Sequence, residues 1–533
     1  MLPSAPQIAA DLALRSLELT PPAAPCALVR SVAAAEAMAA AGQLGQAARI
    51  ARDTLAKPLP TAVEARLRCV LSSVLCARGQ ASDAHAEAGV VLAQPRLPED
   101  VRDRALTAQL QALAGLHDEV GGPVAEATIV APGQHDNHAV AAALVARAVI
   151  AWDKGQIAEG LELLRDAARH RCGLSPDARH VQPLLALSTA LIDLRELEEG
   201  ENILQAADLQ VPHGTPAQVA LSILRARIHL ANGRLTDADA EGQAALVTAE
   251  TLGAHGYAST ARCVLAMIAL RGGDIAAAMG HAASRVVSMP HFPGLYARIE
   301  AMAAEAQISE ARDGPATALG HIRKIFADLR AHRGLLLGDP AIPAWPVRTS
   351  LAAGDDELAL CAPRTAEALA SDNRGFAALT AAAHSTGLAC LARAAADHTD
   401  PWARASAEDI GVLHARHSDR ERAVHHLTQA VHGYQQVDAT TDAARVRQRL
   451  RKLGVRRRHW SPSAGRPVSG WQSLTDTERI ASELVAKGLN NKQVADQMYV
   501  SVHTVAFHMR QIFRKLNIGS RVELARIVIQ QAQ

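Results

Sequence analysis

Blocks of apolar and polar residues recur over the first 450 positions of the chain: an apolar segment, a short turn with Gly, Asp or Arg, and an Ala-rich segment. The turns are centred near Gly42, Gly79, Gly155, Glu196, Gly233, Gly273, Gly314, Gly354 and Ser418. Most successive centres are separated by about 40 residues, a spacing in the range of helical repeats. The interval from Gly79 to Gly155 is about twice this spacing and predicts a further unit around Gly115 to Gly122. The last interval is irregular and predicts an extra turn near Gly387.

A period of about 40 residues with two helices per unit predicts a helical-repeat array over residues 1–453. Each helical hairpin has an apolar stripe that it cannot bury alone, so neighbouring hairpins are expected to stack into an α-solenoid. The turn glycines are expected at helix C-termini, where a left-handed backbone is needed. The array resembles tetratricopeptide repeats, although large aromatic anchors are missing and the period exceeds about 34 residues. Such arrays form concave surfaces that bind peptides, proteins or small effector molecules.

Composition supports an all-α chain. Aromatic residues are 3% of the 533 residues, fewer than a sandwich or barrel of this size uses. Apolar residues are 49% and charged residues 20%, which argues against disorder. No apolar run approaches a membrane span and the N-terminus lacks a secretory signal, so no membrane partner is expected. Seven scattered cysteines without a CxxC motif indicate reduced thiols, and we expect a cytoplasmic protein.

Charge divides the chain unevenly. Residues 445–533 contain 17 basic and five acidic residues, a net charge of +12, whereas residues 1–444 carry a net charge of −11. A basic C-terminal end indicates a polyanion partner for that end, or a solvated basic tail. Residues 454–473, rich in Pro, Gly and Ser, indicate a domain boundary, and the basic linker proper is assigned to 454–466. The run Arg456–Arg458 there could contact phosphate or solubilise a hinge.

The array lacks signatures of catalysis. GxxxxGK[ST], GxGxxG, GxSxG and HExxH are all absent, so we expect no enzyme, cofactor, catalytic residue or metal site. Adjacent histidines do not share a helix face, and no acid or cysteine completes a ligand set around them. Packing or solvated roles are therefore expected for His414, His417, His425 and His426, for Cys69 and Cys76, and for Trp152, Trp345 and Trp402.

The C-terminal segment, residues 474–533, divides into four short helical segments. The predicted boundaries are a capping box of Thr475 and Glu478, an end at Gly488 with Leu489 packing back, N-caps at Asn491 and Ser501, a break at Gly519–Ser520 and a fourth helix over 521–531. The apolar faces of the first two helices are Ile480, Leu484 and Val485, and Val494, Ala495 and Met498.

A helical wheel of the third segment, at 100° per residue, separates three faces. The apolar stripe consists of Val505, Met509, Ile512, Phe513 and Leu516, and the outward face of His503, Ala506, Phe507, Arg510 and Arg514. Thr504, His508 and Lys515 form a polar flank. An outward reading face beside phosphate ligands, after a short turned helix, is helix-turn-helix geometry. The alternative is a generic four-helix mini-bundle.

Many residues of this segment stand at the fixed spacing of one family. They are Leu474-Thr475, Glu478, Leu484, Gly488-Leu489, Asn491-Lys492, Val494-Ala495, Ser501, Thr504-Val505, His508, Ile512, Lys515-Leu516, Ser520-Arg521 and Glu523 to Arg526. Residues 467–532 thus resemble the LuxR-type helix-turn-helix domain, whose third helix enters the major groove of double-stranded DNA.

The resemblance implies roles for individual residues. Base contacts fall to Ala506, Phe507 and Arg510, and contacts to phosphate or to the helix approach fall to Lys492, Thr504, His508, Arg514 and Lys515. Many relatives carry a polar or basic reader where Ala506 and Phe507 stand, which leaves the target sequence open. The fourth helix often dimerises such domains, so Ile527, Val528 and Ile529 are the expected dimerisation residues of a homodimer on DNA.

The preceding segment, from His414 to Arg458, resembles the C-terminal half of large ATP-binding LuxR regulators. These carry an NTPase module before their helical repeats, whereas this chain begins in the repeats and is expected to lack it. An acidic phosphoacceptor module is also not expected, because no region alternates strands and helices. The sequence predicts a transcriptional regulator whose repeats act as a sensor, for a protein or small-molecule effector, or as a protein-interaction scaffold. The alternatives are an interaction scaffold with a secondary DNA-binding module and a subunit that assembles with a separate ATPase chain.

Overall fold

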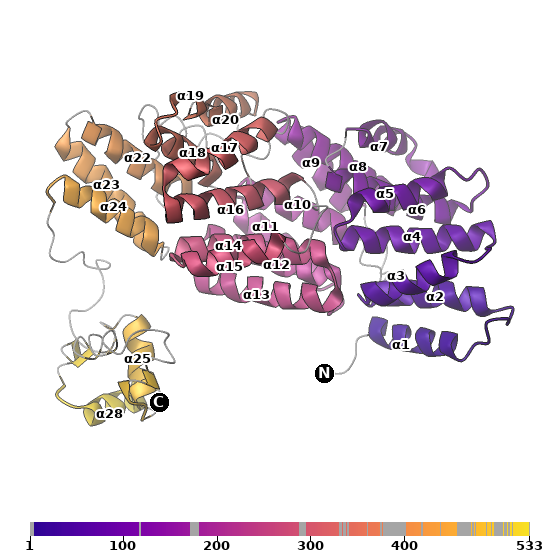
Figure 1. Ribbon diagram of the computed structural model, residues 1–533, viewed down its shortest axis with the longest axis horizontal. Helices are drawn as coiled ribbons and strands as arrows, with labels where there is room; N and C mark the ends of the chain where they lie inside the picture. The colour runs from indigo at the N-terminus through magenta and orange to yellow at the C-terminus, as the bar shows by residue number, and fades with distance from the viewer. Residues whose placement is uncertain are drawn as a thin grey trace. The chain divides into compact units, whose positions relative to one another are not determined.

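The regular structure of the chain is helical throughout the part that the computed structural model describes (Figure 1). The described residues are 5–116, 119–170, 181–286, 295–329, 333, 337, 341–359, 361–373, 376, 401–416, 419–436, 439–455, 471, 474, 476–486, 488–491, 493–494, 505, 509, 512–513, 515–516 and 518–531. The chain forms two compact units, Met1–Val455 and Arg456–Gln533. The expected all-α fold is confirmed.

The first unit is an array of helices in which most pack on the next described helix, and alternate helices such as α4, α6 and α8 also contact one another. Its helices are α1 (Ala5–Glu18), α2 (Ala27–Ala40), α3 (Leu44–Leu55), α4 (Thr61–Ala77), α5 (Ala81–Leu92), α6 (Glu99–Leu116), α7 (Gly121–Val130), α8 (Asn137–Asp153), α9 (Ile157–Arg169), α10 (Gln182–Asp193), α11 (Leu197–Asp208), α12 (Pro216–Ala231), α13 (Leu235–Leu252), α14 (His255–Gly272), α15 (Ile275–Val286), α16 (Leu295–Asp313), α17 (Pro315–Leu329), α18 (Ala341–Ala352), α19 (Asp356–Ala359), α20 (Cys361–Asp372), α22 (Pro401–Arg416), α23 (Arg420–Gln436) and α24 (Thr440–Lys452). The predicted α-solenoid is thereby confirmed. Helices α6 and α7 are the unit expected around Gly115 to Gly122, whereas the turn expected near Gly387 lies outside the described residues.

The turn glycines have the left-handed backbone that their sequence position predicts. Gly42, Gly79, Gly155, Gly233, Gly273, Gly314 and Gly354 have φ between +75° and +98°. A side chain at such a φ is sterically unfavourable, so glycine ends the first helix of a hairpin at little cost. In the unit centred near Glu196, Arg195 takes this conformation with φ +65°. Ser418, the last predicted centre, lies outside the described residues.

The array curves until turns far apart in sequence meet. An alanine Cβ at Gly42 would lie 2.5 Å from the carbonyl oxygen of Gly214, and one at Gly256 would lie 3.0 Å from the Cα of Gly79. These close approaches bring the first two hairpins against the start of α12 and α14, five hairpins further along the chain. Glycine therefore serves two purposes at Gly42, a left-handed turn and a backbone contact that a larger residue would prevent.

A third such contact joins Asn373, after α20, to the turn between α8 and α9. Its amide nitrogen donates to the Gly155 carbonyl at 2.7 Å, and its amide oxygen accepts from the Ile157 backbone N–H at 2.9 Å. Asn373 is buried, so its side chain satisfies backbone groups that are shielded from water.

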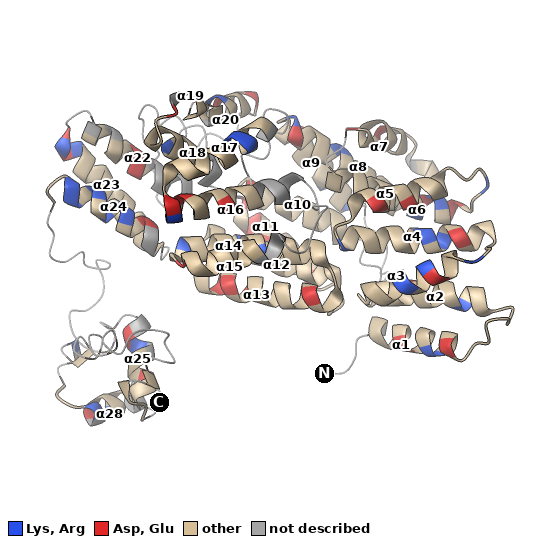
Figure 2. Cartoon of the chain, in the orientation of Figure 1, with Lys and Arg blue, Asp and Glu red and all other residues tan. Residues whose placement is uncertain are grey.

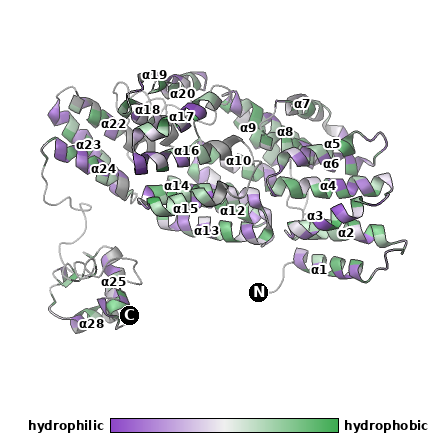
Figure 3. Cartoon of the chain, in the orientation of Figure 1, coloured by the Kyte–Doolittle hydropathy of each residue, from purple (hydrophilic) through white to green (hydrophobic). Residues whose placement is uncertain are grey.

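Small residues build much of the core. Ala35, Ala47, Ala48 and Ala51 are buried in the cluster around Met38, which spans α1 to α4 and reaches Ala254 before α14. Figure 3 shows hydrophobic and hydrophilic positions side by side on the helices, as amphipathic packing requires. Trp152 and Trp345 lie in a cluster that joins α8–α11 to α16–α20, so their expected packing role is confirmed. The side chain of Trp402 is outside the described set.

Buried charges hold the last helices of the array together. Glu408 on α22 is 0% exposed and accepts from Arg445 of α24 at 2.6 and 2.9 Å. Tyr434 donates its hydroxyl to the same carboxylate at 3.1 Å, and Asp409 accepts from Arg348 of α18. Figure 2 shows the basic residues of α24 spaced along that helix. Part of the basic excess counted from residue 445 is thus used inside the array rather than offered to a polyanion.

The second unit has its own small core. Its described helices are α25 (Asp476–Ala486) and α28 (Arg521–Gln531), which contact each other. The bounds of α28 are those that the sequence predicts. Leu474, Ala481, Val485, Val494, Val505, Met509, Ile512 and Leu524 form the buried centre.

Candidate nucleic-acid interface

The third helical segment of the second unit has the inward face that its periodicity predicts. Val505, Met509 and Ile512 are buried in the core of this unit, and Phe513 and Leu516 pack against it. The same cluster includes Val485 from α25 and Leu524 from α28. The predicted apolar stripe is therefore confirmed.

The residues expected to touch DNA are mostly outside the described set. These are Ala506, Phe507 and Arg510 for bases, and Lys492, Thr504, His508 and Arg514 for phosphates. Their roles stay predictions. Lys515 is described, and its ammonium lies 2.5 Å from the carboxylate of Glu478. Glu478 is buried on α25, so Lys515 joins the third segment to the first helix of the unit.

The chain turns after α25 at the glycine that the sequence predicts. Gly488 has φ +88°, and the Leu489 backbone N–H donates to the Leu484 carbonyl at 3.3 Å. Leu489 packs against the core, which confirms its expected packing back. Glu478 was expected to reach back to Thr475 as a capping box, but Thr475 lies outside the described residues and the Glu478 carboxylate accepts from Lys515.

The cap of the second helix was assigned to the wrong residue. The side-chain oxygen of Asn490, rather than that of Asn491, accepts from the Gln493 backbone N–H at 3.0 Å. In return, the side-chain oxygen of Gln493 accepts from the Asn490 backbone N–H at 2.9 Å. This reciprocal arrangement is a capping box. Two adjacent asparagines made the sequence ambiguous, and the Gln three residues after Asn490 was the signal that could have decided between them. Asn491 instead accepts from Arg521 of α28 at 2.9 Å.

Helix α28 is held at its start by a second capping box. The Glu523 carboxylate accepts from the Ser520 hydroxyl at 2.8 Å and from the Gly519 backbone N–H at 3.2 Å. These hydrogen bonds to Ser520 and Gly519 lower the pKa of Glu523. Arg521 also donates to the Leu489 carbonyl at 2.8 Å, so the start of α28 is fastened to the turn that precedes the second helix.

The three apolar neighbours near the C-terminus differ in their surroundings. Val528 packs against the core that contains the buried Leu524. Ile527 is half-buried and is not part of that core. The side chain of Ile529 is outside the described set. Ile527 is thus the described residue of the three that lies outside that core.

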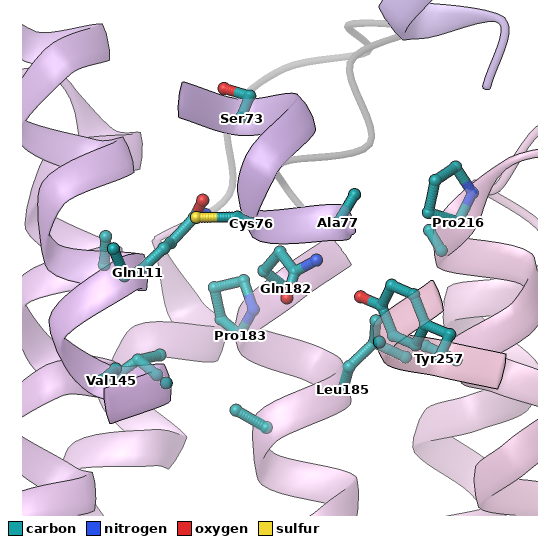
Figure 4. A pocket seen from close by; sticks show the side chains of 18 of the residues that line it. Ser73, Cys76, Ala77, Gln111, Val145, Gln182, Pro183, Leu185, Pro216 and Tyr257 are labelled. Carbon is teal, nitrogen blue, oxygen red and sulfur yellow. The ribbon is translucent and has the colours of Figure 1, made fainter. Parts of the chain in front are cut away.

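The first unit contains a cavity of about 1170 Å³ on the inner side of the array (Figure 4). Its walls come mainly from α2, α4, α6, α8, α10, α12 and α14. Figure 4 shows Cys76 of α4, Gln111 of α6, Gln182 of α10 and Tyr257 of α14 around it. Cys76 was interpreted from sequence as a core residue, and the structure puts it in the cavity wall. No sequence signal marks this cavity, because its walls meet through contacts between distant hairpins.

Other chemistry is sparse in the described part of the chain. No group of three His, Cys, Asp or Glu side chains there is arranged to hold a metal ion. His414 stacks on His426 with ring centres 5.6 Å apart, and His426 meets His425 edge to face. None of the described helices is both long and apolar enough to cross a membrane.

Comparison with known proteins identifies the second unit. Residues 472–528 match the model of the family described as bacterial regulatory proteins, luxR family. The C-terminal unit is a LuxR-family helix-turn-helix domain, which confirms the resemblance drawn from its motif positions.

Known relatives share this domain with the chain. The chain is 48% identical over 59 residues to a helix-turn-helix-type transcriptional regulator of Mycobacterium bovis, and the match covers 11% of this chain and 7% of that protein. It is 44% identical over 59 residues to the nitrate/nitrite response regulator protein homolog of Haemophilus influenzae, covering 11% and 28%. The matches thus span less than a third of either relative and characterise the C-terminal unit alone.

The array has a similar solved structure, the Rap protein complexed with competence and sporulation factor. The TM-score is 0.43 and the sequence identity is 10%, over 73% of this chain and 98% of that chain. At that level the likeness carries no argument about what the array binds.

Proposed function

We propose that the protein is a sequence-specific DNA-binding transcriptional regulator, and that its helical array is a sensor or an interaction scaffold. The observation that carries the proposal is the LuxR-family domain at 472–528, with the apolar stripe of its third segment fixed on the core. Both relatives named above are described as regulators. The protein acts by binding rather than by catalysis.

Within this proposal, the third helix enters the major groove, where each base pair presents a distinct pattern of donors and acceptors. Ala506, Phe507 and Arg510 face the bases, and Lys492, Thr504, His508 and Arg514 lie against the backbone. We assign Lys515 to the approach of the helix, because its ammonium is paired with the buried Glu478. The charges of the remaining basic residues supply the sequence-independent part of the affinity.

The DNA-bound form is a homodimer. Two domains related by a two-fold axis would occupy two half-sites, as dimeric helix-turn-helix proteins do. Helix α28 provides the contact, since Ile527 is half-buried outside the core of the unit. Binding of an effector to the array then alters DNA binding by this dimer.

Genome-wide immunoprecipitation of the intact chain tests the regulator proposal against the scaffold alternative. Discrete sites with a shared sequence are expected for the unaltered chain, and Arg510→Ala should lose or broaden them. Arg49→Gln, a charge removal at an exposed position on α3, should leave the sites unchanged. If no discrete site appears while the array still captures a protein partner, the scaffold alternative is correct.

A further inference from the structure

The cavity inside the array has the composition of a ligand site. We propose that it binds an amphiphilic organic anion of low molecular mass, with the anionic group near α2, α4 and α6 and the apolar body extending towards α14. This inference rests on the proposed sensor role of the array and gives that role a ligand class. Small-molecule sites are concave, mostly apolar and furnished with a few polar groups, and they measure about 300–1,000 Å³. The volume of about 1170 Å³ is enough for a ligand at the upper end of that range.

Many of the residues that line the cavity are alanines. Ala77, Ala141, Ala148, Ala186 and Ala220 all stand in the cavity wall. A methyl side chain leaves the space that leucine or phenylalanine would fill between facing helices. The resulting hollow is partly open, so a ligand can reach it from solvent. Burial of an apolar ligand surface there is favourable.

The closure of the array favours a small ligand over a folded partner. Gly42 lies against Gly214, and Gly79 lies against Gly256, so the walls formed by the early and later hairpins meet. Tyr257 lines the cavity and also packs against the clusters on both sides of this junction. A folded domain too large for a cavity of about 1170 Å³ would have to separate these contacts, whereas a small molecule fits between the walls.

The part of the cavity near α10, α12 and α14 has no excess charge. Asp193 and Arg227 form a pair at 2.8 Å in its wall. Cys76, at the C-terminal end of α4, lies beside Tyr257 of α14. Burial raises the pKa of the Cys76 thiol to about 12, and burial also raises the pKa of Tyr257, which forms a hydrogen bond with Gln182. Both groups are therefore neutral at physiological pH. This end offers hydrogen bonds and apolar surface to the uncharged part of a ligand.

The part near α2, α4 and α6 carries a positive excess. Glu36 accepts from Nε and Nη2 of Arg66 and from Nη1 of Arg104, so one carboxylate is shared by two guanidinium groups. All three residues line the cavity. Each guanidinium has five N–H donors, and Glu36 occupies only some of them. A carboxylate, sulfate or phosphate on a ligand can accept the others in charge-assisted hydrogen bonds.

Calorimetric titration of the full chain with three probes of equal chain length tests the assignment: dodecanoate, 1-dodecanol and dodecyltrimethylammonium. Dodecanoate should bind to one site per chain, at least about tenfold tighter than the other two, because a hydrogen bond between charged groups is worth roughly one to two powers of ten in affinity. No saturable binding of dodecanoate, or tightest binding of the cation, would overturn the proposal.

Two pairs of variants locate the site. Arg104→Gln should weaken dodecanoate about tenfold and leave 1-dodecanol unchanged, because Arg66 still neutralises Glu36. Its control is Arg49→Gln, on an exposed position of α3. Gln111→Trp should block dodecanoate and 1-dodecanol by filling the cavity, whereas Gln205→Trp, exposed on α11, should not. Thermal unfolding of each variant checks the fold. Unchanged binding in both cavity variants would overturn the site.

Two further measurements distinguish a small-molecule site from a peptide site, and a failure of the ligand inference from a failure of the proposed DNA binding. An acetylated acidic peptide that binds in place of dodecanoate, and is blocked by Gln111→Trp, would show a peptide site and contradict the small-molecule class. Immunoprecipitated DNA sites are measured for the same chains. If those sites persist while dodecanoate fails to bind, the ligand inference is wrong and the proposed DNA-binding function stands.

Discussion

The ammonium of Lys515 lies against the buried carboxylate of Glu478, which joins the third segment of the C-terminal unit to its first helix. Glu478 is 4% exposed, so its charge depends on this partner more than a surface carboxylate would. The sequence suggested that Lys515 would touch DNA phosphate or support the helix approach. The pairing with Glu478 favours the second role.

Lys515→Met should therefore destabilise the C-terminal unit rather than change its response to salt. Removing one partner of a buried ion pair weakens the compensation of the other charge, and we expect a loss of up to about 3–5 kcal/mol. Hydrogen exchange of the α25 amides in the intact chain measures the loss. Arg526→Met, at an exposed position on α28, is the control and should have little effect.

A double variant separates the two roles of Lys515. Replacing both partners, Glu478→Leu with Lys515→Met, should restore most of the stability, since apolar substitutes for a buried pair are often neutral. The assignment would be wrong if Lys515→Met left exchange unchanged and lowered the slope of log affinity against log salt by about 0.9, the value for one lost phosphate contact.

Ile527→Ser should prevent dimerisation on DNA with little loss of stability, because Ile527 lies outside the core of the unit. Val528→Ser is the matched comparison and should lower stability by about 1–3 kcal/mol, because Val528 packs on the core. Sedimentation of the chain with DNA carrying two half-sites measures the stoichiometry. Two copies of the Ile527→Ser chain bound as tightly and cooperatively as two unaltered chains would argue against α28 as the interface.

Gly42→Ala should weaken the closure of the array. The new Cβ would lie 2.5 Å from the Gly214 carbonyl oxygen, and φ is +77°. Gly354→Ala is the control: φ is +80°, but the Cβ would meet open space. We expect about 1 kcal/mol of destabilisation for the control and about 2–3 kcal/mol for Gly42→Ala, measured by urea unfolding. Equal effects would show that Gly42 serves only the turn.

The end of the array should respond to acid through Glu408. Burial alone would raise the pKa of Glu408, but the charge and hydrogen bonds of Arg445, with Arg348 and Arg449, lower it to about 2 from 4.5. A depressed folded-state pKa contributes stability that is complete above about pH 4.5 and is lost as the pH falls towards 2. The contribution is on the order of 3 kcal/mol. Asp409 acts in the opposite sense, because burial raises its pKa from 3.8 to about 6. As the pH falls from about 6 to 3.8, the folded state binds a proton at Asp409 more readily than the unfolded state does, and this binding stabilises the fold.

Glu408→Gln should remove the loss of stability between pH 4.5 and 2 while lowering stability at pH 7. Hydrogen exchange of α23 across this range measures it, with Glu421→Gln, exposed on α23, as the control. Parallel pH profiles for the unaltered chain and Glu408→Gln would contradict the assignment.

Local signals were enough to predict the solenoid and the C-terminal fold. A glycine such as Gly79 marks a turn by its own backbone requirement, and Val505, Met509 and Ile512 mark an inward face by their spacing. What sequence could not supply depends on contacts across long separations. The partner of Lys515 is 37 residues away, and the approach of Gly42 to Gly214 depends on the curvature of five hairpins. The cavity follows from that curvature, so no segment of sequence indicates it.

Sequence-specific DNA binding through the third helix is the central claim, and Arg510 is the residue that tests it most directly. A guanidinium can reach O6 and N7 of one guanine together, a contact worth about 1–3 kcal/mol of discrimination. The measurement is a set of binding isotherms for the intact chain and Arg510→Ala, on a selected operator and its single-base variants, at two salt concentrations. Arg510→Ala should relax the preference at one base position in each half-site and leave the other positions discriminating. Uniform weakening on every sequence, with the base preference intact, would contradict the docking of the third helix in the major groove.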